Sequence, residues 1–312
     1  MNGVFFWLGS TIWSFFSLLA RVLAQFGFLK STKLPVRVVS VGNIQAGGAG
    51  KTPLVAQIAR EAHERGILTC ILSRGYGGEW EKSGGLISPQ APVQDPQFSG
   101  DEAALLHGLA PHAWIGVGAD RLKQFLEVMF LTQNKIEMVI LDDGFQHWKI
   151  KKDLEILALT SKTRFTTLFR DFACMIRISH LVVWTKGDKR PHFWGRASAT
   201  VRFQVTPPKS SRKYWFVSGI ADPDEARKTA EKAGFQVEKH VRFPDHARYE
   251  KTSVQSIFDS AARASCSVLV TGKDYVKLRM LGFSEGTLEV LEPDVQFQEG
   301  KSEWDRHLWG TQ

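Results

Sequence analysis

Cysteine is scarce in this sequence, and the three that occur, Cys70, Cys174 and Cys266, are far apart. None belongs to a Cys-x-x-Cys motif, and so sparse and odd a count excludes a disulfide framework and a cysteine-ligated zinc site. The chain therefore fits a reducing compartment. Repeats and low-complexity tracts are also lacking, so the 312 residues can form an ordinary core in one large domain or two compact ones.

Acidic residues are fewer than basic ones: the sequence has 32 Asp and Glu and 40 Lys and Arg, so its net charge is +8. A basic protein favours anionic partners, which include nucleic acids, phospholipid head groups and phosphorylated substrates. The sequence has no aromatic and basic motif of the kind that reads nucleic acids, so we expect no nucleic-acid partner.

Charge is absent from Val4 to Ala20, a stretch that as a helix would be roughly 25 Å long, a little short of the ~30 Å core of a bilayer. A signal peptide would need a basic start, which Met1–Gly3 does not supply. A buried core helix would be unusually rich in aromatic residues. We favour a membrane anchor, because Arg21, Lys30 and Lys33 follow it and would meet anionic lipid head groups.

Short apolar runs alternate with helical patterns through the next part of the chain, which predicts a mostly parallel sheet with helices on both faces. Residues 75–100, rich in Gly, Pro and Ser, are expected to be irregular. The predicted strands are Val36–Val41, Ile67–Ser73, Met138–Leu141, Leu154–Leu159 and Leu181–Trp184. The predicted helices are Thr52–Arg65, Asp101–Leu109 and Arg121–Phe130.

A glycine-rich turn between the first strand and the first helix resembles a P-loop. Glycines let backbone N–H groups approach phosphates, while Lys51 can reach the β- and γ-phosphates and Thr52 can ligate Mg²⁺. The standard pattern has glycine where this chain has Gln45, so the loop is a variant; a tight turn that ends in Gly-Lys-Thr by chance is the alternative. The residues predicted to bind ATP are Gln45, Ala46, Gly47, Gly48, Ala49, Gly50, Lys51 and Thr52.

A second acidic position for Mg²⁺ is expected at a strand end, and Asp142 and Asp143 follow the apolar Met138–Leu141 run. Paired aspartates are often only a turn or a helix cap. Here Gln146 and His147 follow closely, and this density of polar groups favours a functional turn.

The predicted organisation is an α/β protein of the P-loop NTPase-like kind with an appended unit. Thr206–Lys213 reads as a linker, and the pattern after it predicts strand Tyr214–Val217, helix Pro223–Ala233 and strand Val268–Thr271. We therefore expect an N-terminal hydrophobic helix, a P-loop core and a smaller C-terminal α/β domain. Their predicted bounds are 1–28, 29–208 and 209–312.

Seven motifs occur in the order and spacing typical of tetraacyldisaccharide 4'-kinases, and the chain resembles this family over about residues 34–280. The motifs are Val41–Asn43 with Gly47–Pro53, Ser73–Gly78, Gly100–Ala103, Leu141–His147, Gly219–Pro223, Phe243–His246 and Thr271–Asp274.

The resemblance implies a kinase that transfers the γ-phosphate of ATP to the 4'-hydroxyl of a tetraacylated glucosamine disaccharide 1-phosphate, which makes lipid IVA in lipid A biosynthesis. It also implies work at the cytoplasmic face of the inner membrane, among anionic membrane lipids. ATP and Mg²⁺ would be its cofactors.

Carried over by position, the resemblance makes Asp101 the base near the sugar hydroxyl, assisted by His246. A carboxylate paired with a histidine suits deprotonation of an alcohol. Taken alone, Asp101 reads as a helix cap and His246 as a loop residue. The implied Mg²⁺ ligands are Thr52 together with Glu102, Asp142 or Asp143.

The motifs identify the residues that contact the substrate or the phosphates less specifically than they identify the base and the metal ligands. Arg74, Tyr76 and Arg121 are the candidates for these contacts. The alternative is that these side chains only form hydrogen bonds within a loop or lie on a solvated helix face. Two motifs depart from the family. Leu168–Asp171 stands where a Gly-x-Leu-Arg-Glu stretch is common, so Asp171 keeps the carboxylate with a shorter reach, and Gly272 replaces a glutamate.

A nucleotide switch or metal-chaperone GTPase, which hydrolyses without transfer to a lipid, is the competing function. Guanine readers usually present Asn-Lys-x-Asp after a strand, and Trp184–Asp188 keeps Lys-x-Asp while Thr185 replaces the asparagine.

Overall fold

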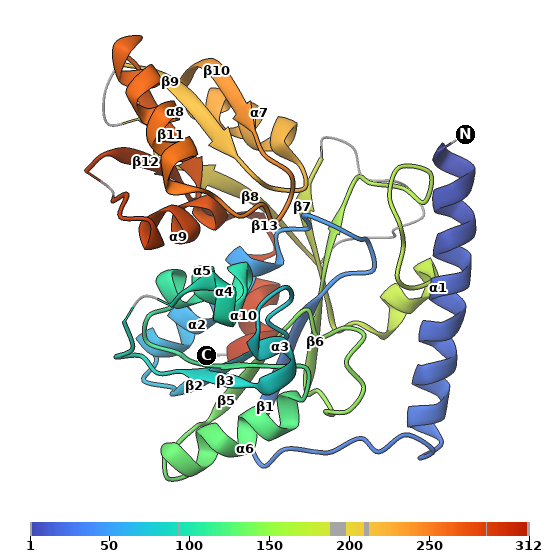
Figure 1. The fold of residues 1–312 in the computed structure, drawn as a ribbon. Coiled ribbons are helices and arrows are strands. Elements are labelled where there is room, and N and C mark those ends of the chain that lie inside the picture. Colours follow the sequence, from blue (N-terminus) through green and yellow to red (C-terminus); the bar gives the residue numbers. More distant parts are fainter. Residues whose placement is uncertain (1, 93, 188–197, 209–211, 285, 311–312) are drawn as a thin grey trace.

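Two sheets organise the chain in the computed structural model, which describes residues 2–92, 94–187, 198–208, 212–284 and 286–310 (Figure 1). The larger sheet has nine strands in the order β13-β8-β7-β6-β1-β5-β2-β4-β3, and only its outer pairs β13·β8 and β3·β4 are antiparallel. Its strands are β1 (Arg37–Gly42), β2 (Thr69–Ser73), β3 (Gly85–Ile87), β4 (Trp114–Val117), β5 (Met138–Asp142), β6 (Leu154–Thr160), β7 (Leu181–Lys186), β8 (Ala199–Val205) and β13 (Pro293–Glu299).

Helices cover both faces of the larger sheet, as the alternation in the sequence predicted. On one face, Val39 and Val41 of β1 pack with Leu54 of α2 (Lys51–Glu64) and with α5 (Asp101–Leu109). On the other face, Val38 packs with Phe125 of α6 (Arg121–Leu131). Strands β1, β5 and β6 are buried on both faces and form the middle of the sheet. The P-loop follows the carboxyl end of β1, and the turn at residues 142–147, here called the aspartate turn, follows that of β5.

The predicted elements lie close to the observed ones. Helix Asp101–Leu109 has the predicted bounds, and the other predicted helices and strands end within two residues of the prediction. Residues 75–100 are not wholly irregular, because they include α3 (Trp80–Ser83), β3 and α4 (Pro96–Ser99).

The smaller sheet, in the order β10-β9-β11-β12, forms the predicted C-terminal α/β unit, drawn in orange in Figure 1. Its strands are β9 (Lys213–Ser218), β10 (Gln236–Arg242), β11 (Ser267–Thr271) and β12 (Leu288–Leu291), and its helices are α7 (Pro223–Lys232), α8 (Lys251–Arg263) and α9 (Gly272–Met280).

The end of the chain returns to the larger sheet. Strand β13 pairs with β8, and α10 (Lys301–Trp309) buries Trp304 and Leu308 in the core that also holds α2. We therefore propose one change to the expected domain bounds, which assigns residues 293–310 to the P-loop unit.

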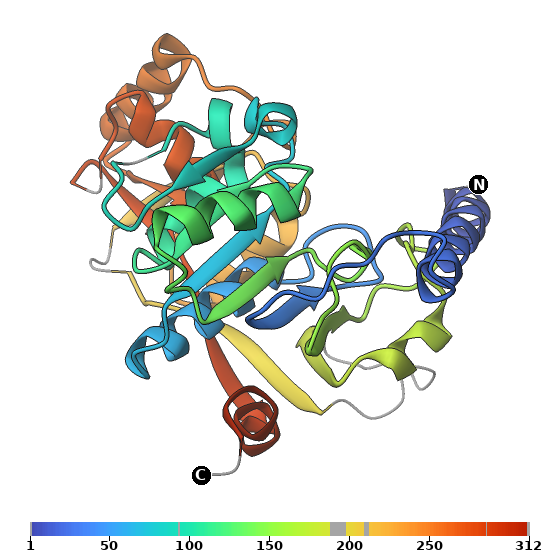
Figure 2. The same cartoon turned by 90° about the horizontal axis from the view of Figure 1, so that it is seen from below.

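Helix α1 (Asn2–Gln25) lies along one edge of the molecule, beside the yellow-green part of the chain that includes the 3-10 helix η1 (Ala173–Ile178) (Figures 1 and 2). Its segment Val4–Gln25 is long and apolar enough to cross a membrane by length and composition. Large apolar side chains stay in solvent, with Phe5 75% and Phe16 62% exposed. This exposure does not fit the buried core helix that the sequence left open.

Candidate active site

The P-loop joins β1 to α2 and approaches its neighbours so closely that glycine is required. Gly50 is the N-cap of α2 with φ +72°, and a Cβ there would lie 2.2 Å from Cζ of Phe203. A Cβ on Gly42 would lie 2.5 Å from Cβ of Phe145, in the aspartate turn. No described atom lies within 4 Å of where a Cβ of Gly47 would be. The loop is thus crowded by its neighbours at Gly42 and Gly50 and open around Gly47, and an open loop that leads into a helix N-terminus suits an anionic ligand.

Gln45, at the position where a glycine is standard, uses its side chain for the loop itself. Its amide nitrogen donates to the carbonyls of Thr160 and Lys162 at 2.9 and 2.7 Å, and its amide oxygen accepts from the N–H of Thr160 at 2.9 Å. Gln45 is 1% exposed. Its side chain therefore anchors the loop to the end of β6, and only its backbone is left to meet a nucleotide.

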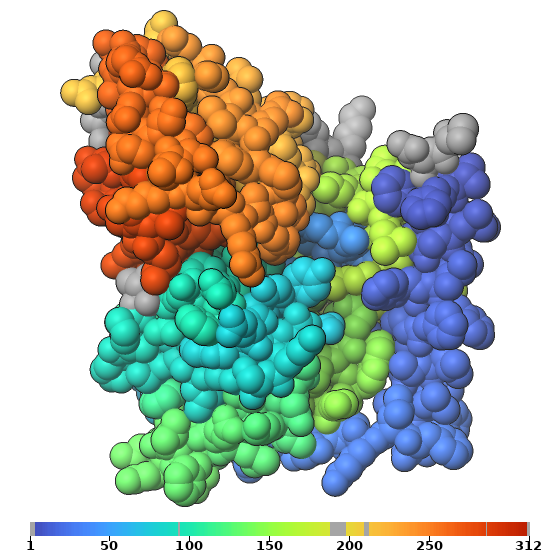
Figure 3. All heavy atoms as spheres, viewed as in Figure 1, coloured from blue at the N-terminus to red at the C-terminus, as the bar shows by residue number. Residues whose placement is uncertain are grey.

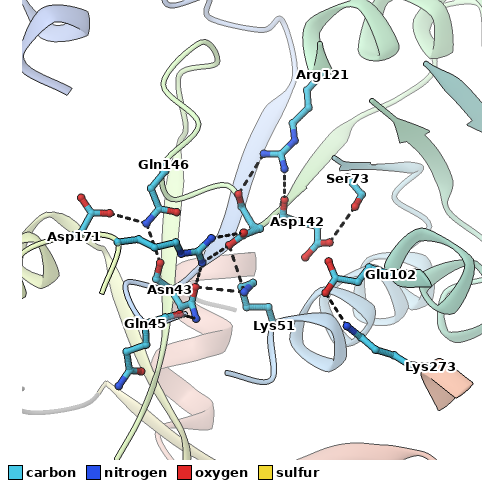
Figure 4. A network of polar contacts seen from close by, with 12 residues as sticks. Asn43, Gln45, Lys51, Ser73, Glu102, Arg121, Asp142, Gln146, Asp171 and Lys273 are labelled. Carbon is cyan, nitrogen blue, oxygen red and sulfur yellow. Dashed lines mark hydrogen bonds and ion pairs between the residues drawn. The ribbon is translucent and has the colours of Figure 1, made fainter. Parts of the chain in front are cut away.

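The turn after β5 is held in an unusual conformation by two arginines. Asp143 has φ +50°, a region that non-glycine residues rarely adopt. Arg170 binds its carboxylate with two N–O contacts of 2.6 and 2.8 Å. Arg121, 4% exposed, donates to the carbonyls of Asp142 and Asp143 at 2.7 and 3.3 Å. Arg121 thus shapes the turn, and this geometry gives no support to the expected substrate contact (Figure 4).

Lys51 and Asp143 connect the P-loop to this turn. The Lys51 ammonium lies 3.4 Å from the Asp143 carboxylate and donates to the amide oxygen of Asn43 at 3.3 Å. Burial alone would raise the pKa of Asp143, but Lys51 and Arg170 hold that pKa well below its ordinary value. Asp143 is therefore a permanent anion that is already paired.

Asp142 lies in the opposite electrostatic environment. It is 2% exposed and accepts a hydrogen bond from the Ser73 hydroxyl at 3.2 Å. Burial and then the negative charge of Glu102 raise the pKa of Asp142 to about 6. Figure 4 shows the carboxyl groups of Asp142 and Glu102 facing one another. Two acidic groups that repel each other beside a phosphate loop fit a place for a cation.

Asp101 and His246 come together across the two units of the chain. Oδ2 of Asp101 lies 3.0 Å from Nδ1 of His246, which follows the smaller sheet's β10. The same oxygen lies 2.9 Å from the ammonium of Lys277 on α9. The N-cap of α5 is Gly100. The Asp101 carboxylate is therefore engaged by two side chains of the C-terminal unit and not by the helix end.

The remaining predicted contacts lie around this junction. Glu102 pairs with Lys273 of α9 at 2.9 Å; burial works against ionisation, but Lys273 and Lys51 lower the pKa of Glu102. The Tyr76 ring packs edge-on against the His246 ring with centroids 5.8 Å apart, and Tyr76 is 63% exposed. Arg74 pairs with Glu81 at 2.8 Å. Tyr76 thus lies beside the Asp101–His246 pair, whereas Arg74 is paired within its own loop.

Asp171 is buried, away from the nucleotide side of the loop. Its carboxylate accepts from the Ser17 hydroxyl at 2.5 Å and from the Gln146 amide at 2.6 Å. Burial raises the pKa of Asp171 despite these two hydrogen bonds. The shorter side chain at this position therefore binds α1 and the aspartate turn.

Four further residues complete the site and were not predicted from the sequence. Asn43 accepts from both Lys51 and Arg170, and Lys273 and Lys277 hold Glu102 and Asp101. Arg170 and Lys273 lie inside motifs that the sequence analysis quoted, so a search of those motifs for charge partners would have found them. Lys277 lies outside every quoted motif and is found only through the fold.

Thr185, the threonine in the guanine-reader-like motif, braces the P-loop. It is 3% exposed, and its hydroxyl donates to the carbonyls of Ala49 and Leu159 at 2.9 and 3.0 Å. Asp188 of the same motif lies outside the described residues.

Within the described part of the chain, no three His, Cys, Asp or Glu side chains form a metal cluster by themselves. A magnesium ion bound at a P-loop needs fewer protein ligands, since phosphate oxygens and water supply the rest.

Comparison with known proteins gives a consistent result. The profile of the family "Tetraacyldisaccharide-1-P 4'-kinase" matches residues 3–170 and 176–309. A tetraacyldisaccharide 4'-kinase from Geobacter sulfurreducens is 32% identical over 265 residues, 77% of this chain and 74% of the relative. One from Psychrobacter arcticus is 26% identical and covers 96% of this chain and 84% of the relative. The crystal structure of LpxK from Aquifex aeolicus in complex with ATP superposes with a TM-score of 0.74, at 26% identity and 99% coverage of both chains.

Proposed function

Since this chain belongs to the tetraacyldisaccharide-1-P 4'-kinase family, we propose that it transfers the γ-phosphate of ATP to the 4'-hydroxyl of a tetraacylated glucosamine disaccharide 1-phosphate. The product is lipid IVA, an intermediate of lipid A biosynthesis. As a member of this family the protein is an ATP-dependent phosphotransferase.

The main support for the proposal is that two kinds of site, the P-loop and the Asp101–His246 pair, lie next to one another beside the larger sheet. The P-loop supplies Lys51 and the N-terminus of α2, and the adjacent α5 brings Asp101 to His246 of the other unit. Asp101 and its neighbour Glu102 join the two sites, because Glu102 is close enough to Lys51 for their charges to interact. A hydrolytic switch needs the first site only, whereas a kinase needs a base for its acceptor as well.

In the proposed reaction, Asp101 accepts the proton of the 4'-hydroxyl as its oxygen attacks the γ-phosphorus and ADP leaves. His246 and Lys277 orient the Asp101 carboxylate. Lys51 offsets the charge that develops on the transferred phosphoryl group. Tyr76 is exposed beside His246, and in this proposal it contacts the sugar.

Mg²⁺ would be held by Asp142 at the end of β5 and by Thr52 in the first turn of α2, with Glu102 nearby. Asp143 fits it less well, because Arg170 and Lys51 already neutralise its carboxylate. When bound, the ion would neutralise negative charge on the phosphates of ATP. Burial and the negative charge of Glu102 raise the pKa of Asp142 although Lys51 and Arg121 lower it, so a further cation at this carboxyl group would be stabilised.

We further propose that the protein works at the cytoplasmic face of the inner membrane, among anionic lipids. Exposed aromatic side chains of α1 support this, since they give the helix an apolar outer face. Lys30 and Lys33 follow this helix and can meet lipid head groups.

The test separates a kinase from a nucleotide switch. Purified protein in detergent micelles is given ATP or GTP with Mg²⁺, with and without the disaccharide lipid, and nucleoside diphosphate release is measured. The proposal predicts ADP release that depends on the lipid and little use of GTP. Equal hydrolysis without the lipid contradicts it.

A further inference from the structure

Helix α1 carries a polar stripe that an anchor in lipid does not need. Ser10, Ser14 and Ser17 are spaced by four and three residues, so they lie on one face of the helix. They are 0%, 0% and 5% exposed, although large apolar residues of the same helix, such as Ile12 and Phe16, are about 60% exposed. A buried hydroxyl is tolerated where it has a hydrogen-bond partner.

Each of these serines is hydrogen-bonded to the same short segment, residues 164–171. The Ser10 hydroxyl accepts from the backbone N–H of Phe169 at 2.8 Å. The Ser14 hydroxyl accepts from the Arg164 guanidinium at 3.2 Å. The Ser17 hydroxyl donates to the Asp171 carboxylate at 2.5 Å. The helix also approaches closely here, since a Cβ on Gly9 would lie 3.1 Å from Cδ1 of Leu168. Figure 3 shows α1 in dark blue packed along its yellow-green neighbours.

The other side of segment 164–171 is paired with the first half of the P-loop. Ala46 donates its N–H to the Leu168 carbonyl at 2.7 Å, and Arg170 donates its N–H to the Ile44 carbonyl at 2.7 Å. The Thr167 hydroxyl adds a bond to the Ala46 carbonyl at 3.1 Å. The segment thus forms a short strand-like pairing with the loop that approaches phosphate.

The same segment sets the position of a charged group in the site. Arg170 binds both oxygens of Asp143 and the side chain of Asn43. One residue later, Asp171 binds Gln146, whose amide also donates to the Asn43 carbonyl at 3.0 Å. A shift of the segment would therefore move the P-loop and the aspartate turn together.

We propose that α1 is a positioning element of the nucleotide site, in which Ser10, Ser14 and Ser17 hold segment 164–171 against the P-loop and keep Arg170 on Asp143. This role is additional to membrane binding and depends on the opposite face of the helix. It rests on the proposed function only in taking the P-loop as the ATP site.

The test uses detergent micelles, where membrane delivery of substrate plays no part. Ser17→Ala, Ser10→Ala and the triple serine-to-alanine variant are compared with Thr11→Ala. Thr11 is the matched control, because its hydroxyl bonds only to the Trp7 carbonyl of its own helix. Calorimetry measures the Kd for ATP of the full-length protein without lipid, and turnover at saturating lipid gives kcat.

We expect the triple variant to bind ATP about tenfold more weakly and to lose kcat by a similar factor, since the buried Phe169 N–H and the buried Asp171 carboxylate each lose a hydrogen bond from α1. Ser17→Ala should show part of the loss, and Ser17→Thr, which keeps the hydroxyl, should recover most of it. Thr11→Ala should match the parent protein. If the triple variant does not fold, the single variants decide.

An unchanged Kd for ATP and an unchanged kcat in folded serine variants overturn the positioning role. An equal loss in Thr11→Ala overturns it too, since the effect then comes from the helix in general. Failure of the parent protein to bind ATP would instead remove the proposed function, so the two failures are distinguishable.

Discussion

Oδ2 of Asp101, at the start of α5 in the P-loop unit, lies 3.0 Å from Nδ1 of His246 in the C-terminal unit. The two residues are 145 positions apart. Lys277 approaches the same carboxylate oxygen at 2.9 Å. The proposed catalytic base is therefore held in place by side chains from both units of the chain.

If Asp101 and His246 act as one unit, removing either should lower kcat by about 10² or more, and removing both should cost little beyond that. The measurement is kcat at saturating ATP and lipid for Asp101→Asn, His246→Ala and the double variant. Asparagine caps a helix as well as aspartate, so an Asp101→Asn enzyme with full activity, or additive losses, would remove the dyad from this account.

Lys277→Met should lower kcat by about tenfold or more and leave ATP affinity unchanged, because it removes a cation that touches Asp101 and not the P-loop. Methionine keeps most of the length and the apolar stem of the lysine. Lys251→Met, on the exposed start of α8, is the control. A loss of ATP affinity without a loss of kcat would show that Lys277 supports the fold between the units instead.

Lys51→Ala should lower phosphoryl transfer by a factor on the order of 10² to 10³, because Lys51 offsets charge on the transferred group. Its Nζ lies 3.4 Å from Asp143 and 3.3 Å from the Asn43 amide oxygen, so the alanine leaves polar partners and no core cavity. Circular dichroism should stay unchanged. Near-normal turnover by a folded Lys51→Ala protein would contradict the P-loop assignment.

Asp142→Asn should abolish activity and yet stabilise the protein at neutral pH in EDTA. The pKa of Asp142 is raised from 3.8 to about 6, so the folded state holds this proton more tightly than the unfolded chain. Stability is therefore lost as pH rises from about 4 to about 6, and asparagine removes that loss. The gain is about 3 kcal/mol at most, from roughly two pKa units at 1.36 kcal/mol each.

Asp143→Asn is the matched control for this experiment, because the pKa of Asp143 is shifted in the opposite direction by Lys51 and Arg170. It should destabilise the protein at neutral pH. Urea unfolding at pH 7.5 and pH 5 measures both variants. A gain for Asp142→Asn that does not shrink at pH 5 would refute the electrostatic explanation.

Replacing Phe5, Ile12 and Phe16 on the exposed face of α1 by serine should release the protein from vesicles that contain anionic lipid. These side chains are exposed in the folded chain, so their loss should not change the Kd for ATP. Flotation of the variant with vesicles as complete as that of the parent protein would show that this face is not the membrane contact.

The sequence predicted the helices, strands and turns that are determined by residues close together in the chain. A β-branched run before a glycine-rich turn identifies β1 and the P-loop, and an apolar run before Asp142 and Asp143 identifies β5. The family motifs predicted that Asp101 and His246 belong together. Lys277 was missed because its partner is distant in the chain, and the return of β13 to the larger sheet was missed because antiparallel pairing with β8 leaves no local signal. The hydrogen bonds of Arg121 to the carbonyls of Asp142 and Asp143 were not predicted, because the burial of a charged helix residue depends on tertiary packing.

The most direct test of the central claim is a mass spectrum of the lipid after incubation of the purified protein with ATP, Mg²⁺ and the tetraacylated disaccharide 1-phosphate. The account predicts a product that has gained one phosphate on the 4'-oxygen, with one ADP released for each phosphate, and formation of this product about 10²-fold or more slower with Asp101→Asn. ATP consumed while the lipid stays unphosphorylated would contradict it.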